Sequence, residues 1–335
     1  MSQDRVRDFR EVVSHMIEKN DLINLTSKEK QYAHYGYHFT DINNAASILN
    51  SGKLLSRNRA LESKLMINDN ASKDVILSTH PEIMDYVRFY FRPQTPTQFR
   101  NEGIMSKTEI ENSSYKAHCP IPVFLLFNSW DLLGMEGMYF TSESLAKHHD
   151  VKLYNDIANF ESMPFDRIFH NRSLYNNPKK AEIISNRHAE IVMRDELKID
   201  KLKYVYVRSL PEKEYLLTLL DQDTRNRYEK IILIDNKKKL FYGSRAYLIS
   251  SVTDSKNINL NFNTGNSDPE FNVRLEIRDL EKGIFGWGPK KIKLSDMPSF
   301  DISKEELHHY EIKIYLDNIK AYQSRYDYIS DDLPF

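Results

Sequence analysis

The run from Ile121 to Asn128, IPVFLLFN, is the most apolar segment of the chain and constrains the fold more than any other feature. Its length and its boundaries predict a strand that is buried on both faces at the centre of a sheet. Aromatic and β-branched runs elsewhere can supply neighbouring strands. These runs are 34–39, 85–93, 137–141, 188–197 and 202–210.

Helical patterns lie between these strands. Residues 5–19 place apolar side chains at helical spacing with charges between them, which predicts an amphipathic helix. Thr40 and Asp41 are good helix caps, and the helix that they introduce should end at Gly52. The run 214–222 also has a helical pattern. Short strands mixed with short capped helices predict an α+β fold.

The pattern changes near residue 210. Residues 230–252 predict a hairpin with a polar turn near Asp235, and 272–280 and 309–317 predict two strands separated by a Gly- and Pro-bearing loop at 283–291. Loops are also expected near 68–74 and in the acidic tail. We therefore divide the chain into an N-terminal helical extension (1–30), a core (31–210) and a β-rich C-terminal addition (211–335) of unknown role.

The overall charge gives no general attraction to nucleic acid or membrane, since 47 Lys and Arg face 48 Asp and Glu. Basic residues are concentrated in 172–208 and 225–245, which can track phosphates or simply form a solvated surface. The single cysteine, Cys119, excludes a disulfide framework and favours a reducing compartment. No signal peptide or membrane span is evident, so we expect a cytoplasmic protein without a membrane partner.

Several common chemistries lack their motifs. The chain has no Walker loop and no Gly-x-Ser-x-Gly elbow, and GIFGWG has the wrong spacing for a dinucleotide fingerprint. The pairs His148-His149 and His308-His309 have no further ligand at a metal-binding spacing. We therefore expect neither an ordinary kinase, hydrolase or dehydrogenase nor a metal site.

Three separated segments carry a more specific signal. The first begins with His38-Phe39-Thr40 and continues through Asn44 to Leu54. The second is DYVRFYFRPQTP at 85–96, and the third is RHAE at 187–190 followed by an apolar strand. Together they resemble the DarT family of nucleic-acid (DNA-base) ADP-ribosyltransferase toxins, which are usually encoded beside a macrodomain antitoxin. The resemblance covers about residues 34–208.

The resemblance implies an ADP-ribosyltransferase fold with split, mostly antiparallel sheets and flanking helices, to which the β-rich C-terminal addition is joined. It implies that NAD is the substrate and that ADP-ribose moves to a nucleobase of single-stranded DNA or RNA. The protein would be a toxin of a toxin-antitoxin or phage-defence system, partnered by a macrodomain-type or other antitoxin. The alternatives are a protein-modifying transferase, an NAD glycohydrolase, or an inactive module that binds NAD or nucleic acid.

The resemblance also assigns residues. Glu190 would be the catalytic carboxylate that stabilises the oxocarbenium ion, and His188, on the same face of an extended strand, would help to place the acceptor. Arg92 and Arg187 would contact nucleic acid. One of Tyr90 and Phe91 would stack on nicotinamide while the other enters the core. The residues expected to bind NAD are His38, Phe39, Thr40, Asn44, Leu54, Arg57, Tyr90 and Phe91.

Alternatives and departures remain. Glu190 can be an edge-strand carboxylate facing water, Glu182 is a competing acid, and His38 can be a core histidine. The family has an Arg in the region of residues 60–84, where this chain has none, so Arg57, Arg59, Lys64 or Arg92 would have to serve the phosphates. Arg88 stands where the family segment has Pro. About 125 residues follow the shared core, which leaves open a different acceptor such as guanine or a base in RNA.

Overall fold

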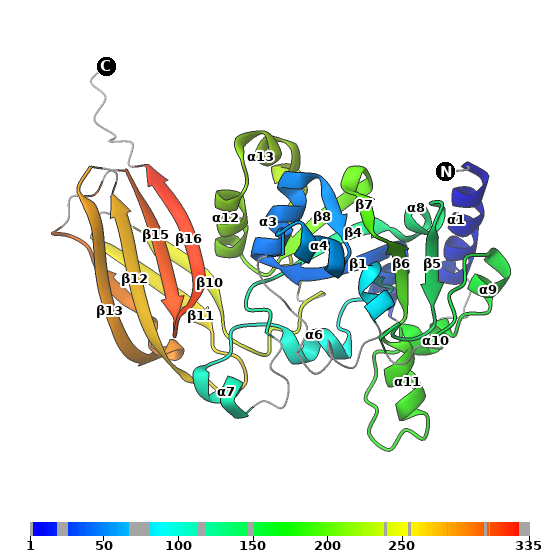
Figure 1. Cartoon of the computed structure of the whole chain (residues 1–335). Coiled ribbons are helices and arrows are strands. Elements are labelled where there is room, and N and C mark those ends of the chain that lie inside the picture. The colour runs from blue at the N-terminus through cyan, green and yellow to red at the C-terminus, as the bar shows by residue number, and fades with distance from the viewer. Residues whose placement is uncertain are drawn as a thin grey trace.

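The computed structural model describes residues 3–18, 26–66, 81–112, 118–146, 151–237, 240–253, 256–279, 281–304, 307 and 309–327. The loop predicted near 68–74, His148-His149, His308 and the end of the acidic tail lie outside these residues. Figure 1 shows a mixed helical and β part that contains the N-terminus and, beside it, a β-rich part that ends in the C-terminus.

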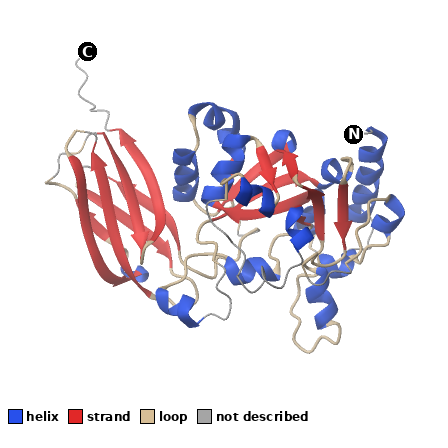
Figure 2. Cartoon of the chain, in the orientation of Figure 1, coloured by secondary structure: helices blue, strands red, loops and turns tan. Residues whose placement is uncertain are grey.

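A seven-stranded sheet organises the first part (Figure 2). Its neighbours pair antiparallel except for the last two strands, which are parallel. The sequence Pro122–Asn128 forms the fifth strand in the sheet order and is flanked on both sides, so the prediction of a central strand is confirmed. The order is β5 (Met138–Thr141), β6 (Glu190–Arg194), β3 (Tyr86–Tyr90), β1 (Tyr35–Asp41), β4 (Pro122–Asn128), β8 (Leu202–Val207) and β9 (Ile232–Ile234).

The sheet divides between β1 and β3. The two strands are in register at Tyr37 and Tyr90 alone. Immediately beyond this pair, the side chain of His38 rather than its backbone reaches β3, where Nδ1 lies 3.0 Å from the Arg88 carbonyl oxygen. Strand β1 continues its ladder with β4 on the other side. The divergence leaves room between the two halves of the sheet.

Helix α3 (Ile42–Ser51) closes one side of this division. The Asp41 carboxylate caps it by accepting a hydrogen bond from the Asn43 amide, and Gly52 ends it in the left-handed region. The predicted amphipathic helix is α1 (Gln3–Glu18), which buries Phe9, Val13 and Met16. None of the helices in the described ranges is long and apolar enough to span a membrane.

The other α-helices of the described residues are no longer than α3. They are α2 (Ser27–Lys30), α4 (Arg57–Glu62), α6 (Pro96–Asn101), α7 (Lys107–Asn112), α8 (Ser129–Leu133), α9 (Ile157–Glu161), α10 (Phe165–Ile168), α11 (Lys180–Asn186), α12 (Leu210–Leu219) and α13 (Gln222–Tyr228).

Two further antiparallel sheets confirm the predicted β-rich C-terminal region. Buried and more exposed residues alternate along its strands, most clearly in β12, so that one face of each strand supplies a core. The first sheet is β10 (Tyr247–Thr253), β11 (Asn257–Asn263) and β14 (Ser299–Asp301), and the second is β13 (Gly283–Lys293), β12 (Glu270–Asp279), β15 (His309–Leu316) and β16 (Ile319–Asp327). A separate pair joins β2 (Lys53–Leu55) to β7 (Glu196–Lys198).

Two local predictions were wrong. Residues 230–252 do not form a hairpin, because β9 pairs parallel with β8 while β10 pairs with β11. The expected loop at 283–291 is most of strand β13. This strand lies at the edge of its sheet, where a proline without an N–H is tolerated. Gly288 and Pro289 lie at a register shift, where two residues of β13 stand opposite one residue of β12.

The C-terminal region is attached to the core by specific contacts. The Glu102 carboxylate accepts hydrogen bonds from the backbone amides of Tyr242 and Gly243 at 3.1 and 2.7 Å. Tyr322 on β16 donates to Glu214 on α12 at 2.5 Å. Strand β9 still belongs to the core sheet, whereas β10 begins the separate sheets. The division into 1–30, 31–210 and 211–335 stays a prediction.

Candidate active site

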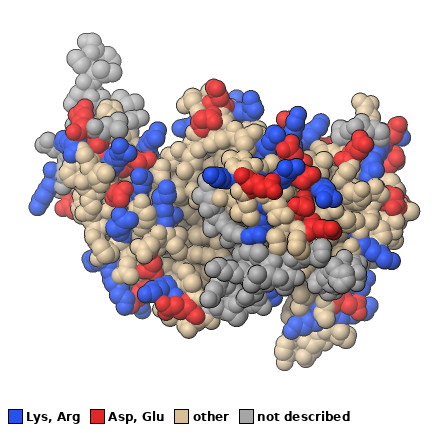
Figure 3. Space-filling view, viewed as in Figure 1, with Lys and Arg blue, Asp and Glu red and all other residues tan. Residues whose placement is uncertain are grey.

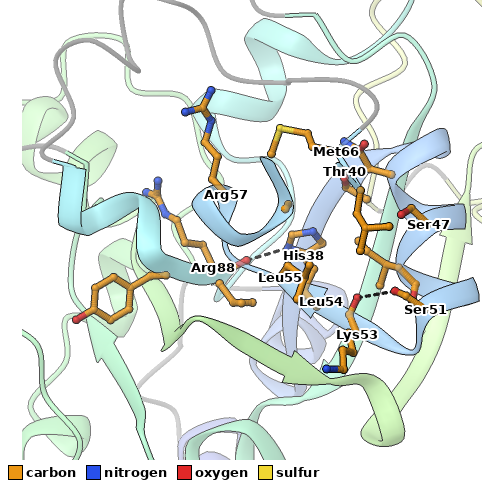
Figure 4. A pocket seen from close by; sticks show the side chains of 16 residues that line it. His38, Thr40, Ser47, Ser51, Lys53, Leu54, Leu55, Arg57, Met66 and Arg88 are labelled. Carbon is orange, nitrogen blue, oxygen red and sulfur yellow. Dashed lines mark hydrogen bonds between the residues drawn. The ribbon is translucent and has the colours of Figure 1, made fainter. Parts of the chain in front are cut away.

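A pocket opens where the sheet divides. It has a volume of about 820 Å³ including its open mouth. Five of the residues predicted to bind NAD line it, which are His38, Thr40, Asn44, Leu54 and Arg57. The other lining residues are Ser47, Ile48, Ser51, Lys53, Leu55, Ala60, Leu65, Met66, Tyr86, Val87 and Arg88. Figure 4 shows that strand β1, helix α3, the turn into β2, helix α4 and strand β3 all contribute to its walls.

One face of α3 supplies two hydroxyl groups that the sequence interpretation missed. Asn44, Ser47, Ile48 and Ser51 are three or four residues apart, so they share one side of the helix. Ser51 donates to the Lys53 carbonyl oxygen at 3.3 Å. The spacing from Asn44 was a usable signal, because a helix that presents Asn44 to a ligand also presents the residues one and two turns later.

His38 lies in the pocket wall with a defined hydrogen-bonding role (Figure 4). The Arg88 carbonyl can only accept, so His38 Nδ1 carries the proton in their 3.0 Å hydrogen bond. Burial lowers the pKa of the His38 ring, although the same hydrogen bond opposes the shift. A neutral ring protonated on Nδ1 leaves Nε2 as an acceptor for a ligand hydroxyl or amide.

Thr40 follows His38 by two residues on β1 and lines the same pocket. The alternative that Thr40 is only a helix cap is not supported, since Asp41 occupies the cap position of α3.

Glu190 is the first residue of β6 and has no exposed surface. Strand β6 lies between β5 and β3, so the alternative of an edge-strand carboxylate facing water is wrong. Its Oε2 accepts from the Leu145 amide at 2.9 Å, and its Oε1 accepts from Arg88 at 2.5 Å. Burial raises the pKa of Glu190, while the Arg88 guanidinium acts in the opposite direction. The carboxylate is therefore held by two donors from different elements.

His188 is close to Glu190 in sequence but is not on its strand. It lies in the turn after α11, where Nδ1 hydrogen-bonds the Ile184 carbonyl at 3.0 Å. The argument that an extended strand places His188 and Glu190 on one face was wrong, because β6 begins only at Glu190. Burial lowers the pKa of His188 to about 4, so the ring is neutral near pH 7. Its role in placing the acceptor stays a prediction.

The competing carboxylate does not reach the pocket. Glu182 is exposed on α11 and pairs with Arg167 at 2.7 Å. A solvated surface pair of this kind offers no buried charge to a reaction.

The structure separates the three predicted aromatic contacts. Phe39 projects from the face of β1 opposite to His38 and packs on Phe124, with ring centroids 5.3 Å apart. Phe91 is 2% exposed and packs against core aromatic rings. Neither lines the pocket, and their contact with NAD stays a prediction. Tyr90 is the one that shares a face with Glu190, directly across from it on β3.

Arg92 is buried in hydrogen bonds within the protein, and its predicted contact with nucleic acid is not supported by this position. It is 1% exposed, and its guanidinium donates to the carbonyls of Ile168 and His170 and to the Asn171 side chain. These bonds brace a loop, and burial lowers the pKa of Arg92 to about 10. Arg187 donates to the same His170 carbonyl at 2.8 Å but is only half-buried. Its contact with nucleic acid stays a prediction.

Comparisons with known proteins identify the family. A family model described as ssDNA thymidine ADP-ribosyltransferase, DarT, matches residues 37–242, which is more than half of the chain. No curated protein matches.

Similar solved structures include a Thermus sp. 2.9 DarT in complex with ADP-ribosylated ssDNA (18% identity, TM-score 0.49, 63% of this chain and 97% of that one). Others are the same Thermus protein in complex with NAD+ (17%, 0.46, 63% and 98%) and a Thermosipho africanus DarTG in complex with ADP-ribose (14%, 0.45, 64% and 53%).

Proposed function

This chain belongs to the DarT family of ssDNA thymidine ADP-ribosyltransferases, and from that premise we propose that Glu190 directs the transfer of ADP-ribose from NAD to a base of single-stranded DNA. The observation that carries the assignment to Glu190 is its position. A fully buried carboxylate is held by the Leu145 amide and by Arg88, and Arg88 lines the pocket where the sheet divides.

The pocket has the groups that NAD requires. His38 Nε2 and the hydroxyls of Thr40, Ser47 and Ser51 offer neutral hydrogen bonds to ribose and amide groups, while Leu54 and its neighbours offer apolar surface to a base. Arg57 places a cation at the wall, where a pyrophosphate can be neutralised. We assign NAD binding to this wall.

The reaction follows from the chemistry of NAD. The bond between the ribose C1′ and the nicotinamide nitrogen breaks, the electron pair leaves with nicotinamide, and the ribose becomes an oxocarbenium ion. The Glu190 carboxylate stabilises that positive charge through a ribose hydroxyl. A nucleophilic atom of the base then bonds to C1′ and loses its proton to solvent or to a neighbouring base such as neutral His188. No redox change occurs.

Charge on the protein surface is mixed rather than uniformly basic. On the face shown in Figure 3, Lys and Arg are interspersed with Asp and Glu over both parts of the chain. A single strand must therefore be attracted by local features and by base contacts rather than by net charge. We place the acceptor near Tyr90 and His188, on the Glu190 side of the pocket.

The biological setting that this activity fits is a cytoplasmic toxin controlled by an antitoxin. Unrestrained modification of DNA bases harms the cell that carries it out, so a restraining partner is needed. A macrodomain, which binds ADP-ribose, is the partner class that suits the product. We divide the chain functionally into a core that ends after β9 and a C-terminal addition that begins at β10.

A partition experiment tests the proposal. Protein is incubated with NAD labelled in its adenylate half and, separately, with single-stranded DNA, single-stranded RNA and a protein extract. Label should appear on DNA, and Glu190→Gln should abolish it. The matched control is Glu182→Gln, which alters an exposed carboxylate and should leave labelling intact. Label on RNA or protein instead, or equal labelling by Glu190→Gln, would contradict the proposal.

A further inference from the structure

Arg88 occupies an unusual position relative to Glu190. It extends from β3 on the face that also carries Glu190, and it lines the pocket. Its guanidinium donates to Glu190 Oε1 at 2.5 Å and to the Ser144 hydroxyl at 3.3 Å. The Glu190 side chain has no exposed surface, whereas that of Arg88 is 30% exposed. The arginine thus connects a buried charge to the open pocket.

The carboxylate needs such a partner if it is to act as an anion. A buried carboxylate without a counterion binds a proton instead of keeping its charge. The Leu145 amide supplies one neutral hydrogen bond to Oε2. A protonated Glu190 would offer no negative charge to an oxocarbenium ion, so the group that keeps it ionised controls whether it can work.

Other nearby cations are engaged elsewhere. Lys53 pairs with Glu196 at 3.1 Å, and Arg59 lies 3.5 Å from Asp195. Arg57 lines the pocket, and its guanidinium lies 3.3 Å from the Met84 sulfur. Within the described residues, the cation in contact with Glu190 is Arg88.

The Arg88 guanidinium is not fully used by the residues around it. Its Nε is buried and has no hydrogen-bond partner. What sets Arg88 apart from the buried pair between Arg208 and Glu212 is that Arg88 lines the pocket and is 30% exposed, whereas Arg208 is 2% exposed.

We propose that Arg88 is the positioning residue of this site: it keeps the Glu190 carboxylate ionised and fixes its orientation toward the nicotinamide ribose. The inference rests on the proposed function of Glu190.

The pH dependence follows from the groups that face Glu190. Arg88 and Tyr90 face it from β3, and His188 lies in the turn before β6, while the neighbouring Thr141 and Ser144 hydroxyls do not titrate in this range. Burial raises the pKa of Tyr90 and lowers the pKa of His188 to about 4. Both side chains therefore stay neutral from about pH 5.5 to about pH 9, a range that lies above the lowered pKa of His188 and below the ordinary pKa of tyrosine. A change in the acidic limb of activity in that window reports on Glu190.

The test measures kcat and KM for nicotinamide release across this pH range, with single-stranded DNA present. Arg88→Met removes the cation but keeps much of the side-chain volume, so the acidic limb of kcat should move upward by about 1–3 pH units. At low pH, kcat of Arg88→Met should fall below that of the wild type by about tenfold for each pH unit by which the limb has moved, and the difference should diminish at high pH. KM for NAD should change much less than kcat.

Two variants make the result specific. Arg88→Lys retains the charge and should restore the acidic limb toward its wild-type position. Arg194→Met removes an exposed arginine from the neighbouring strand β6 and should leave the profile unchanged. Circular dichroism establishes that each variant is folded, and Arg88→Gln replaces Arg88→Met if the latter does not fold.

The inference would be overturned if the acidic limb of kcat stayed in place in folded Arg88→Met or Arg88→Gln. It would also be overturned if Arg88→Lys lost as much kcat at low pH as Arg88→Met. Glu190→Gln separates this failure from failure of the proposed function. If Glu190→Gln releases nicotinamide at the wild-type rate, the role of Glu190 is wrong. If it is inactive while Arg88→Met is unaltered, only the role of Arg88 is wrong.

Discussion

The buried ion pair between Arg208 and Glu212 gives a sharp prediction about what joins the core to the C-terminal addition. Both side chains are 2% exposed, and Arg208 donates to Glu212 through Nε at 2.9 Å and through a terminal nitrogen at 2.5 Å. The same guanidinium lies 4.5 Å from the ring centroid of Tyr247, the first residue of β10. The pair therefore lies at the junction of the two parts.

Glu212→Leu leaves the Arg208 charge buried without its counterion. Breaking one side of a buried pair costs about 3–5 kcal/mol of unfolding free energy. At about 2 °C per kcal/mol for a chain of this size, the melting temperature should fall by about 6–10 °C. The assay is thermal and urea unfolding followed by circular dichroism. Glu229→Leu is the control, because its partner Arg225 is 3.8 Å away and both side chains are well exposed.

A double variant tests the reasoning further. Arg208→Met with Glu212→Leu removes both charges, so it should be more stable than Glu212→Leu alone. A loss below about 1 kcal/mol in Glu212→Leu, the value typical of exposed pairs, would refute the reasoning. So would a double variant whose loss equals or exceeds that of the single one.

Three further predictions concern titrating and reactive groups. His118 and His188 have pKa values lowered by burial from the usual 6.5 to about 4, so protonation favours the unfolded chain. Their stabilisation should be complete above about pH 6.5 and be lost toward pH 4, by up to about 3 kcal/mol each; urea titrations at several pH values check this, and His118→Gln should flatten the decline. Cys119 is fully buried with a raised pKa, so a thiol reagent should label it only after unfolding; rapid labelling of native protein would contradict its placement. His38→Gln should raise KM for NAD less than His38→Ala if Nε2 is the ligand acceptor; equal effects would contradict that role.

The strands of the core were largely predictable because their patterns are local. The apolar run at Pro122–Asn128 buries its side chains on both faces only inside a sheet, and the structure places it there. The pairing partners of residues 230–252 were not predictable, because sequence proximity suggested a hairpin while β9 and β10 belong to different sheets. The Gly and Pro residues of β13 indicate a loop when the sequence is considered alone, because the sequence does not show that β13 is an edge strand.

The site residues were predictable where the regular spacing of side chains along a strand or a helix determines which of them face the pocket. His38 and Thr40 alternate correctly into the pocket, whereas Phe39, between them, points into the core. The surroundings of Arg92 and His188 were not predictable, because they depend on where β3 ends and β6 begins. The contact of Arg88 with Glu190 joins residues 102 positions apart, which no local pattern reveals.

The measurement that tests the central claim most directly is the intact mass of single-stranded DNA oligonucleotides after incubation with NAD and protein. Oligonucleotides that each contain one candidate acceptor base in an otherwise unreactive sequence identify the modified base. We predict a mass increase of one ADP-ribosyl group on one of these bases with the wild-type chain, and none with folded Glu190→Gln. An unmodified oligonucleotide with active wild-type protein, or an equal increase with Glu190→Gln, would contradict the account.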